Sequence, residues 1–359
     1  MAIQGTGTQA DPYLVTNCEE LRWAVSQTNS YVKLVNDIDF NDDSILWLWE
    51  PLFFTCAELD GNHKKITNCY CYQKSFLVVN DADASHTHIF KNTIIEAIYI
   101  SGTTQNYSNN NASFIQPRLD GTGTTSASII GVYFYDCDFR IKFYVEKDDA
   151  VLFYNCHSSN NGYCFLRRCI LNIDTFVNSH QKTILFTVAN PSSSSVIYGD
   201  VKNCEIKVNL HLANSLFTGK FVFNTDTSTT ANQNYYVLNI FNLTTSNGTG
   251  INVENNAVFV NIDGINENLP DKLCIMLAPR AKIANCYFIL NNVMGNYLNT
   301  KNIHFKIHDY PGCTSSCFMN DKAKFYNKNL KNEDPNMHVL TDAQCKNLQD
   351  LLDIGFVVV

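Results

Sequence analysis

Short runs of alternating apolar and polar residues recur along the chain, and most runs are closed by Asn, Asp or Gly. Cys204, Ile206 and Val208, for example, alternate with polar residues. Alternation with a period of two predicts a β-strand that turns its apolar side toward a core. The predicted strands are 31–35, 66–72, 76–79, 94–100, 129–135, 139–145, 151–154, 170–177, 183–188, 196–201, 204–210, 235–241, 257–262, 273–277, 283–290 and 302–308.

An Asn-Cys or Asp-Cys pair recurs within this pattern of strands. The pairs are Asn68-Cys69, Asp136-Cys137, Asn155-Cys156, Asn203-Cys204 and Asn285-Cys286. Small thiols and Asn residues at equivalent places in successive turns are typical of a solenoid, in which one coil stacks on the next. We therefore predict an all-β solenoid whose polar stretches between strands are loops.

The two ends of the chain differ from this pattern. Thr16-Asn17-Cys18-Glu19 has the composition of a capping box and predicts a short helix after it. Thr341-Asp342-Ala343-Gln344 is a second capping box, followed by Cys345, Leu348, Leu351 and Leu352 on one helical face. Helices at both ends would cover the open coils of a solenoid. The predicted divisions are an N-terminal cap (1–45), a solenoid body (46–310) and a C-terminal cap (311–359).

Several segments near the N-terminus combine into a recognisable pattern. They are Gly5-Thr6-Gly7-Thr8, Asp11-Pro12-Tyr13-Leu14-Val15, Tyr31-Val32-Lys33-Leu34, Asp37-Ile38-Asp39-Phe40 and Leu59-Asp60-Gly61-Asn62-His63. Together they resemble the start of right-handed parallel β-helix proteins of the pectin-lyase-like class. Residues 340–344 and 354–356 are similar to the ends of bacteriophage tail appendages and head fibres. The resemblance implies a right-handed parallel β-helix and a virion protein, and this architecture carries enzymes, adhesins and inert spikes alike.

Composition narrows the setting. The net charge is −8, from 34 acidic and 26 basic residues without a basic block, so we expect no nucleic-acid partner. The chain opens on Met1-Ala2-Ile3-Gln4 without a signal-peptide pattern, so we expect its 14 Cys to be reduced thiols made in a bacterial cytoplasm. Four glycosylation sequons, at Asn106, Asn111, Asn242 and Asn247, would matter only in a secretory pathway. No apolar run reaches the roughly 20 residues that span a bilayer, so we expect no membrane insertion.

One acidic and basic cluster is a candidate for catalysis. Asp136 and Asp138 alternate with an apolar position, and Arg140 and Lys142 follow with the same spacing, so all four would face outward on one strand. Arg140-Ile141-Lys142 resembles an element of pectin-degrading hydrolases, and Asp148-Asp149 resembles their paired aspartates. In those enzymes the aspartates come first and a Gly-His-Gly lies between, whereas this chain has the reverse order and no Gly-His-Gly. A solvated strand face is therefore favoured, and no catalytic residue is assigned.

Other clusters suggest metal binding. The acidic groups Asp37 and Asp39, Asp42-Asp43, and Asp81 with Asp83 offer oxygen ligands for Ca²⁺, but without a loop motif we favour turn roles. His86 and His88 lie in a polar stretch and are expected to face solvent. His304, His308, Cys313 and Cys317 have zinc-like composition, but two strand His residues four positions apart are separated by roughly 13 Å. Cys69 and Cys71 face one side of a strand and are expected in the core. We expect no metal or cofactor.

Aromatic pairs offer a further possibility. Tyr70 and Tyr72, and Tyr133 and Tyr135, alternate with apolar positions, and exposed rings could stack on sugars, although core packing is the default. The favoured function is a non-enzymatic virion scaffold, such as a tail appendage or head fibre, that contacts host-surface glycan and neighbouring subunits as a homo-oligomer. A polysaccharide depolymerase and a plain carbohydrate-binding module remain as alternatives.

Overall fold

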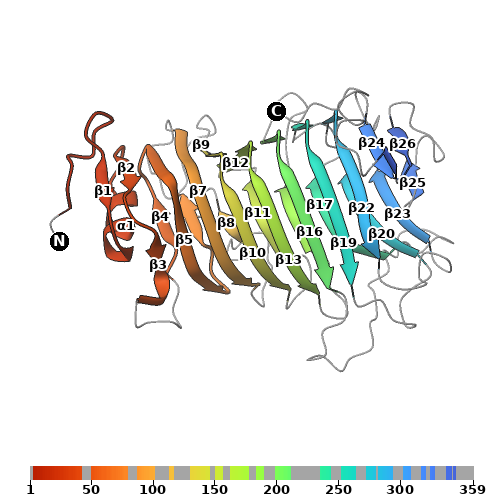
Figure 1. The fold of residues 1–359 in the computed structure, drawn as a ribbon, viewed down its shortest axis with the longest axis horizontal. Helices are drawn as coiled ribbons and strands as arrows, with labels where there is room; N and C mark the ends of the chain where they lie inside the picture. The colour runs from red at the N-terminus through yellow and green to blue at the C-terminus, as the bar shows by residue number, and fades with distance from the viewer. Residues whose placement is uncertain are drawn as a thin grey trace.

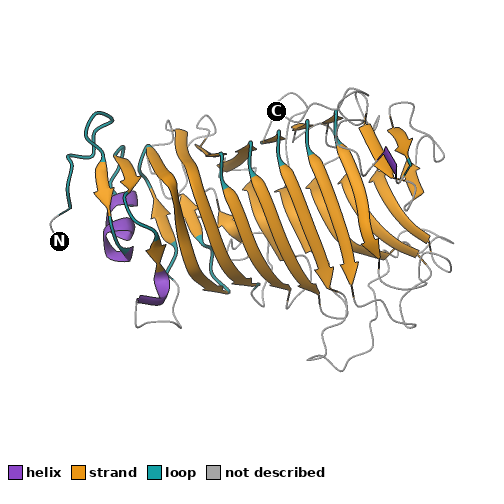
Figure 2. Cartoon of the chain, in the orientation of Figure 1, coloured by secondary structure: helices purple, strands orange, loops and turns teal. Residues whose placement is uncertain are grey.

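The computed structural model shows an elongated stack of parallel strands (Figure 1). It describes residues 3–42, 50–79, 87–101, 113–116, 130–145, 150–156, 162–177, 183–189, 199–211, 235–243, 252–263, 272–279, 282–293, 302–308, 317–320, 324–327, 337–341 and 343–344. Strands make up most of this part, and the helical segments are short (Figure 2). The chain is therefore all-β, as its alternating pattern predicts.

The elements follow one another with short connections. In chain order they are β1 (Tyr13–Val15), α1 (Cys18–Val25), β2 (Tyr31–Leu34), β3 (Ile38–Asp39), the 3-10 helix η1 (Phe40–Asp42), β4 (Leu52–Phe54), β5 (Glu58–Tyr72), β6 (Leu77–Val79), β7 (Thr87–Ile100), β8 (Ser113–Gln116), β9 (Ile130–Tyr135), β10 (Asp138–Val145), β11 (Ala150–Cys156), β12 (Gly162–Arg167), β13 (Ile170–Val177), β14 (Thr183–Ala189), β15 (Asp200–Lys202), β16 (Glu205–His211), β17 (Tyr235–Leu243), β18 (Asn252–Glu254), β19 (Ala257–Asp263), β20 (Lys272–Pro279), β21 (Lys282–Ala284), β22 (Tyr287–Val293), β23 (Asn302–His308), β24 (Cys317–Asn320), β25 (Lys324–Asn327) and β26 (Met337–Leu340).

Each coil contributes a strand to three parallel sheets. One sheet runs β5–β7–β10–β13–β16–β19–β22–β24–β26. A second runs β4–β6–β8–β11–β14–β17–β20–β23–β25, and a third contains β7–β9–β12–β15–β18–β21. Since every strand pairs in parallel with its equivalent one coil on, the chain is a parallel β-helix, and the predicted solenoid is confirmed. Parallel pairing continues past residue 310 through β24 and β26, while the division into body and caps stays a prediction.

Large side chains from successive coils fill the interior of this helix. The rings of Phe90 and Phe134 lie 5.4 Å apart, and those of Tyr99 and Phe143 lie 5.1 Å apart. Contacts of this kind between equivalent positions follow from in-register pairing, because like residues meet across a strand spacing of about 4.8 Å. The core is therefore one continuous column, which gives the stack its stiffness.

A left-handed corner repeats between the third sheet and the first. Its residues have φ near +55°, and they are Asn92, Asp136, Arg168, Asn203, Asn255 and Asn285. Asn and Asp tolerate this backbone better than other L-residues do. The next residue in each coil points inward, which builds a buried column of Thr93, Cys137, Cys169, Cys204, Asn256 and Cys286. The Asp-Cys and Asn-Cys pairs at 136, 203 and 285 thus mark equivalent corners.

Two of the predicted pairs lie elsewhere. Asn68 also has a positive φ, but it stands at an irregularity within β5, and Cys69 pairs across from Ala97. Asn155 and Cys156 are consecutive residues of β11. The prediction that all five pairs are equivalent is therefore wrong for these two, because an Asn can serve several kinds of bend.

The N-terminal helix covers the first coil and buries Leu21, Ala24 and Val25. Its N-cap is Asn17, whose side chain accepts a hydrogen bond from the Glu20 backbone N–H, while the Glu20 carboxylate accepts one from the Thr16 N–H at 2.7 Å. The capping box is real, but it begins one residue later than the sequence suggests. Within the described residues, no helix has the length and apolar character needed to cross a membrane.

The second capping box is confirmed at the C-terminal end. The Thr341 N–H donates to Gln344 Oε1 at 2.9 Å, and the Gln344 N–H donates back to Thr341 Oγ1 at 3.4 Å. Residues 343–344 are helical, and the predicted helical face from Cys345 onward lies outside the described residues.

Candidate functional site

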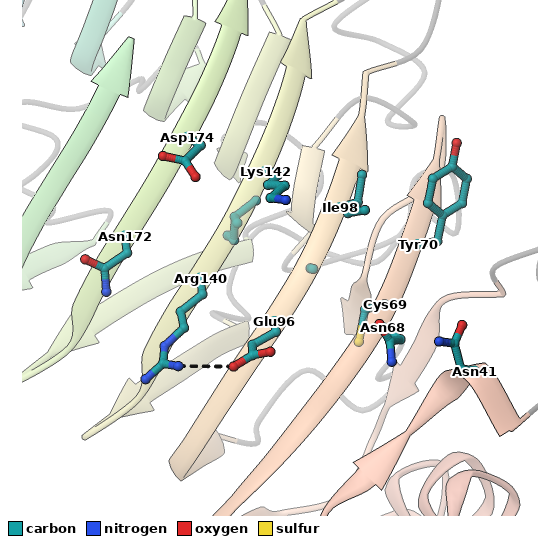
Figure 3. A pocket seen from close by; sticks show the side chains of 12 residues that line it. Asn41, Asn68, Cys69, Tyr70, Glu96, Ile98, Arg140, Lys142, Asn172 and Asp174 are labelled. Carbon is teal, nitrogen blue, oxygen red and sulfur yellow. Dashed lines mark hydrogen bonds and ion pairs between the residues drawn. The ribbon is translucent and has the colours of Figure 1, made fainter. Parts of the chain in front are cut away.

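A groove of about 810 Å³ lies on the outer face of the sheet formed by β5, β7, β10 and β13 (Figure 3). Side chains at every second position of these strands point away from the core and line it. The lining residues are Asn41, Asn68, Cys69, Tyr70, Glu96, Ala97, Ile98, Arg140, Ile141, Lys142, Asn172 and Asp174. In-register pairing brings together residues that are far apart in sequence, so that Glu96, Arg140 and Asn172 form one row across the strands.

The side chain of Arg140, which lines the groove, is held in place by two carboxylates. Its Nε and Nη2 donate to Asp138 Oδ2 at 3.0 and 2.8 Å, and its Nη1 donates to Glu96 Oε1 at 3.1 Å. The hydrogen bond with Asp138 is the largest influence that raises the pKa of Arg140. Both acidic partners and the cation are thereby held in one geometry, with much of their hydrogen-bonding capacity used.

The next row carries a cation with a different environment. Lys142 lies in register between Ile98 of β7 and Asp174 of β13 (Figure 3). It is exposed, and its ammonium group forms no ion pair with any described residue. Asp174 Oδ1 accepts a hydrogen bond from Asn209 Nδ2 at 2.7 Å. The ammonium group of Lys142 is therefore the charge in the groove that is most open to a ligand.

Rings form the row beyond Lys142. Tyr144 stacks on Phe176 and Phe176 on His211, with centroids 4.6 Å apart in both pairs and interplanar angles of 10° and 12°. Because the rings cover each other's faces, they turn mainly their edges outward and are poor platforms for sugars. At the other end of the face, Tyr70 lines the groove and Tyr72 is 46% exposed.

The other predicted tyrosine pair lies on the third sheet. Tyr133 and Tyr135 are half-buried, and the ring of Tyr133 stacks on Phe165 of the next coil at 4.2 Å. Arg167 lies over both tyrosine rings and is held by two hydrogen bonds to the buried Asp200. These rings therefore fasten neighbouring coils.

The predicted outward cluster is confirmed in part. Asp138, Arg140 and Lys142 share the outer face of β10. Asp136 does not, because it occupies the left-handed corner before β10, where Arg168 donates two hydrogen bonds of 2.7 Å to its carboxylate. This pairing lowers the pKa of Asp136. Asp148 and Asp149 lie outside the described residues.

Sequence reasoning missed Glu96, Asn172 and Asp174. They join Arg140 and Lys142 only through pairing between coils, and no local motif marks them. Alternation does place Asn172 and Asp174 on one face of the predicted strand 170–177. The register between coils, which loops of varied length obscure, was the missing information.

The metal hypotheses have mixed outcomes. His88 is fully buried in β7, with Nδ1 2.7 Å from the Cys56 carbonyl oxygen, so the expectation of a solvent-facing histidine is wrong. Asp37 and Asp39 accept backbone hydrogen bonds from Lys65 and Asn41, which fits the favoured turn roles. No group of three or more metal-ligating side chains gathers among the described residues.

The remaining metal candidates are only partly described. His304 and His308 belong to β23, while their side chains and the whole of Cys313, Asp43, Asp81, Asp83 and His86 lie outside the described part. Cys317 is buried in the core.

Three buried thiols near the N-terminal end of the stack, Cys56, Cys69 and Cys71, have the properties of core residues. Ten cysteines of the described part form no disulfide, and all ten are buried. They include Cys69 and Cys71, so the predicted core position of these two is confirmed. Burial raises the pKa of Cys56, Cys69 and Cys71 well above that of an exposed thiol. Thiols of this kind stay protonated and are weak nucleophiles.

Comparisons with known proteins add little to this geometry. No protein-family profile matches the chain, and no curated protein does. A solved structure of a candidate immunoglobulin A1 protease from Bacteroides ovatus aligns with 98% of this chain and 90% of its own, at 12% identity and a TM-score of 0.48. A likeness at this level carries no argument about activity, and the fold rests on the chain's own strand pairings.

Proposed function

We propose that this protein is a rigid, non-catalytic adhesin that binds surface glycan along the outer face of β5, β7, β10 and β13. The observation that carries the proposal is the groove of about 810 Å³, which combines a pre-ordered Arg140 with an open Lys142. Polar hydrogen-bonding groups in a rigid groove suit a hydroxyl-rich polymer, because little ordering entropy is lost on binding.

The acidic groups favour binding over cleavage. Glu96 and Asp138 are both engaged by Arg140, and Asp174 accepts from Asn209. Hydrolysis of a glycosidic bond normally needs one carboxylic acid to give a proton and a second carboxylate to attack or to activate water. Carboxylates committed to structural hydrogen bonds are poorly placed for either task.

The setting that we propose is a bacteriophage particle, as a tail appendage or head fibre assembled in the host cytoplasm. The similarity of residues 340–344 and 354–356 to the ends of such proteins supports it. A homo-oligomer with other virion subunits as neighbours would multiply weak glycan contacts. Immunogold labelling of purified particles tests this setting, since labelled fibres or tails are expected and unlabelled particles would exclude it.

A polysaccharide microarray tests glycan binding. The wild-type protein should bind a subset of capsule and lipopolysaccharide glycans, and Lys142→Ala should lower the affinity about tenfold, because a hydrogen bond to a charged group is lost. Lys202→Ala removes a lysine that is ion paired with Glu254 on the third sheet and serves as the control. Absence of binding, or equal losses in the two variants, would contradict the proposal.

One observation favours a depolymerase as the second candidate. Lys142 stands in the groove without an ion pair among the described residues and lies in one row with Tyr70 and Asp174, so it could act on a sugar proton. Incubation of the protein with each bound glycan separates the candidates. New reducing ends or unsaturated sugars that disappear with Lys142→Ala would establish the enzyme, and intact glycan supports the adhesin.

A further inference from the structure

We infer that the glycan site extends beyond the groove along a ladder of side chains on β13, β16 and β19, and that this extension holds a neutral, linear stretch of the polymer. The inference rests on the proposed glycan binding, and it names the chemistry of the ligand that occupies the part of the site beyond the groove. The ladder consists of Asp174, Asn209 and Asn261, which are in register across three coils. Asp174 also lines the groove, so groove and ladder are continuous.

The ladder has regular hydrogen-bonding geometry. Asn261 Nδ2 donates to Asn209 Oδ1, and Asn209 Nδ2 donates to Asp174 Oδ1, both at 2.7 Å. An amide nitrogen carries two N–H groups, so each Asn keeps one donor that the ladder does not use. These donors repeat at the strand spacing of about 4.8 Å. A polymer whose hydroxyl groups recur along an extended chain can meet successive donors, whereas a compact ligand reaches only one.

Longer side chains stand beside the ladder, and the ladder with these neighbours is here called the trough. Phe176 flanks Asp174 on β13, Lys207 and His211 flank Asn209 on β16, and Phe259 precedes Asn261 on β19. In a strand, residues two positions apart share a face, so these longer side chains share the outer face with the ladder. This arrangement suits a polymer chain that runs across the strands, parallel to the axis of the solenoid.

The charges around the trough do not favour an anionic ligand. Lys207 forms an ion pair with Glu205 on the same strand, and the Asp174 carboxylate, which keeps its negative charge, accepts a hydrogen bond from the side-chain amide of Asn209. Asn209 and Asn261 carry no charge. Hydroxyl groups, which both donate and accept, complement such a surface better than carboxylates or phosphates do. We therefore assign the neutral part of the polymer to the trough and leave any acidic substituent to Lys142.

Next to Ala257 and Phe259 of β19, the outer face of β22 is closed to a ligand. On β22 the outward-facing residues Tyr287 and Ile289 are only 1% and 3% exposed, and they form a second hydrophobic cluster with Phe318 and Leu340. No ligand can lie on these buried side chains. The accessible path therefore runs from β5 to β19, five strand steps or roughly 24 Å.

Length-resolved titration tests this assignment. The probes are cello-oligosaccharides and oligogalacturonides of two to six sugars, titrated by calorimetry into the wild-type protein and into a double variant, Asn209→Leu with Asn261→Leu. Both substitutions are on the surface and remove the ladder's hydrogen bonds. Asn252→Leu, a half-buried strand Asn on the third sheet, is the matched control. Circular dichroism confirms that each variant keeps its strand content.

The inference predicts that the hexamer of the neutral cello-oligosaccharide series binds about tenfold more tightly than its dimer, and that the double variant loses this gain but keeps its affinity for the dimer within about twofold. A gain confined to the acidic oligogalacturonides would contradict a neutral occupant. The control should match the wild type. Equal affinity for dimer and hexamer, an unchanged gain in the double variant, or no binding of either series would overturn the inference. Binding on the polysaccharide microarray would still uphold the proposed function in each of those cases.

Discussion

At the scale of single residues, the stability of the solenoid depends on what occupies the inward position after each corner. Four of the six corners are followed by a cysteine, one by Thr93, and one by Asn256, whose side chain is fully buried. Its Oδ1 accepts from the Cys204 N–H at 2.9 Å, and its Nδ2 donates to the Val201 carbonyl at 2.7 Å. Asn256 thus satisfies backbone groups of the preceding coil, which a thiol does less well.

Replacing Asn256 with Ala should lower the free energy of unfolding by about 2–3 kcal/mol, because a buried backbone N–H loses its partner and a small cavity remains. Urea denaturation followed by circular dichroism measures the change. Asn209→Ala, on the surface, should cost less than about 1 kcal/mol. An equal loss of unfolding free energy in the two variants would show that the buried amide of Asn256 stabilises the fold no more than a surface amide does.

The buried thiols predict a dependence of stability on pH. Burial raises the pKa of Cys71 in the folded state, so above roughly pH 8.5 the unfolded chain loses this proton while the folded chain keeps it. Stability should therefore be complete below this pH and fall as the pH rises. Between about pH 8 and about pH 10, Cys71→Ala should lose about 2 kcal/mol less than the wild type under reducing conditions. Equal losses would mean that Cys71 ionises within the fold.

At this scale the sequence shows the column only in part. Cys137, Cys204 and Cys286 are recognisable because Asn or Asp precedes each of them. Cys169 follows Arg168, and Asn256 stands where four other coils have a thiol. The Asn-Cys or Asp-Cys repeat is therefore absent from the sequence at these two corners, although the backbone conformation repeats. Geometry is conserved between coils more strictly than residue type, because any side chain that tolerates the corner or fills the column will serve.

At the scale of elements, the left-handed corner separates the strands of the third sheet from those of the first. Asn203 has φ of 55° and accepts a hydrogen bond from Asn255 Nδ2 at 3.0 Å. The corner therefore has two requirements, a tolerant backbone and a side chain that links coils. Glycine meets the first requirement alone, and alanine meets neither.

Thermal unfolding of two variants separates these requirements. Asn203→Gly should be mildly destabilising, whereas Asn203→Ala should cost about 1–2 kcal/mol more than Asn203→Gly, since only alanine is strained at positive φ. Both variants lose the bond from Asn255 equally, so their difference isolates the backbone. An alanine variant as stable as the glycine variant would show that the corner relaxes.

Strand prediction was accurate where alternation is long. Strands 170–177 and 302–308 match β13 and β23. β8 and β12 were missed because they are short and their four to six residues alternate weakly. Alternation along β10 also predicted that Asp138, Arg140 and Lys142 share one face. Their partners on β7 and β13 could not be predicted in this way, because they depend on the register between coils, which no local sequence pattern contains.

At the scale of the whole molecule, the coils form a stiff, elongated body (Figure 1). In solution, small-angle X-ray scattering should give an asymmetric distance distribution with an extended tail, as expected for a rod with one core along its axis. A symmetric distribution, typical of a sphere, would contradict the stacked arrangement. Urea up to the unfolding transition should leave the distribution unchanged, because neighbouring coils stabilise one another.

Photo-crosslinking tests the position of the binding face most directly. A benzophenone amino acid replaces Asn172 in the groove, or Asn252 on the third sheet, and each protein is irradiated with the polysaccharide that binds best on the microarray. The account predicts a glycan adduct with the probe at position 172 and none with the probe at position 252. Adducts of equal yield at both positions, or an adduct at 252 alone, would contradict it.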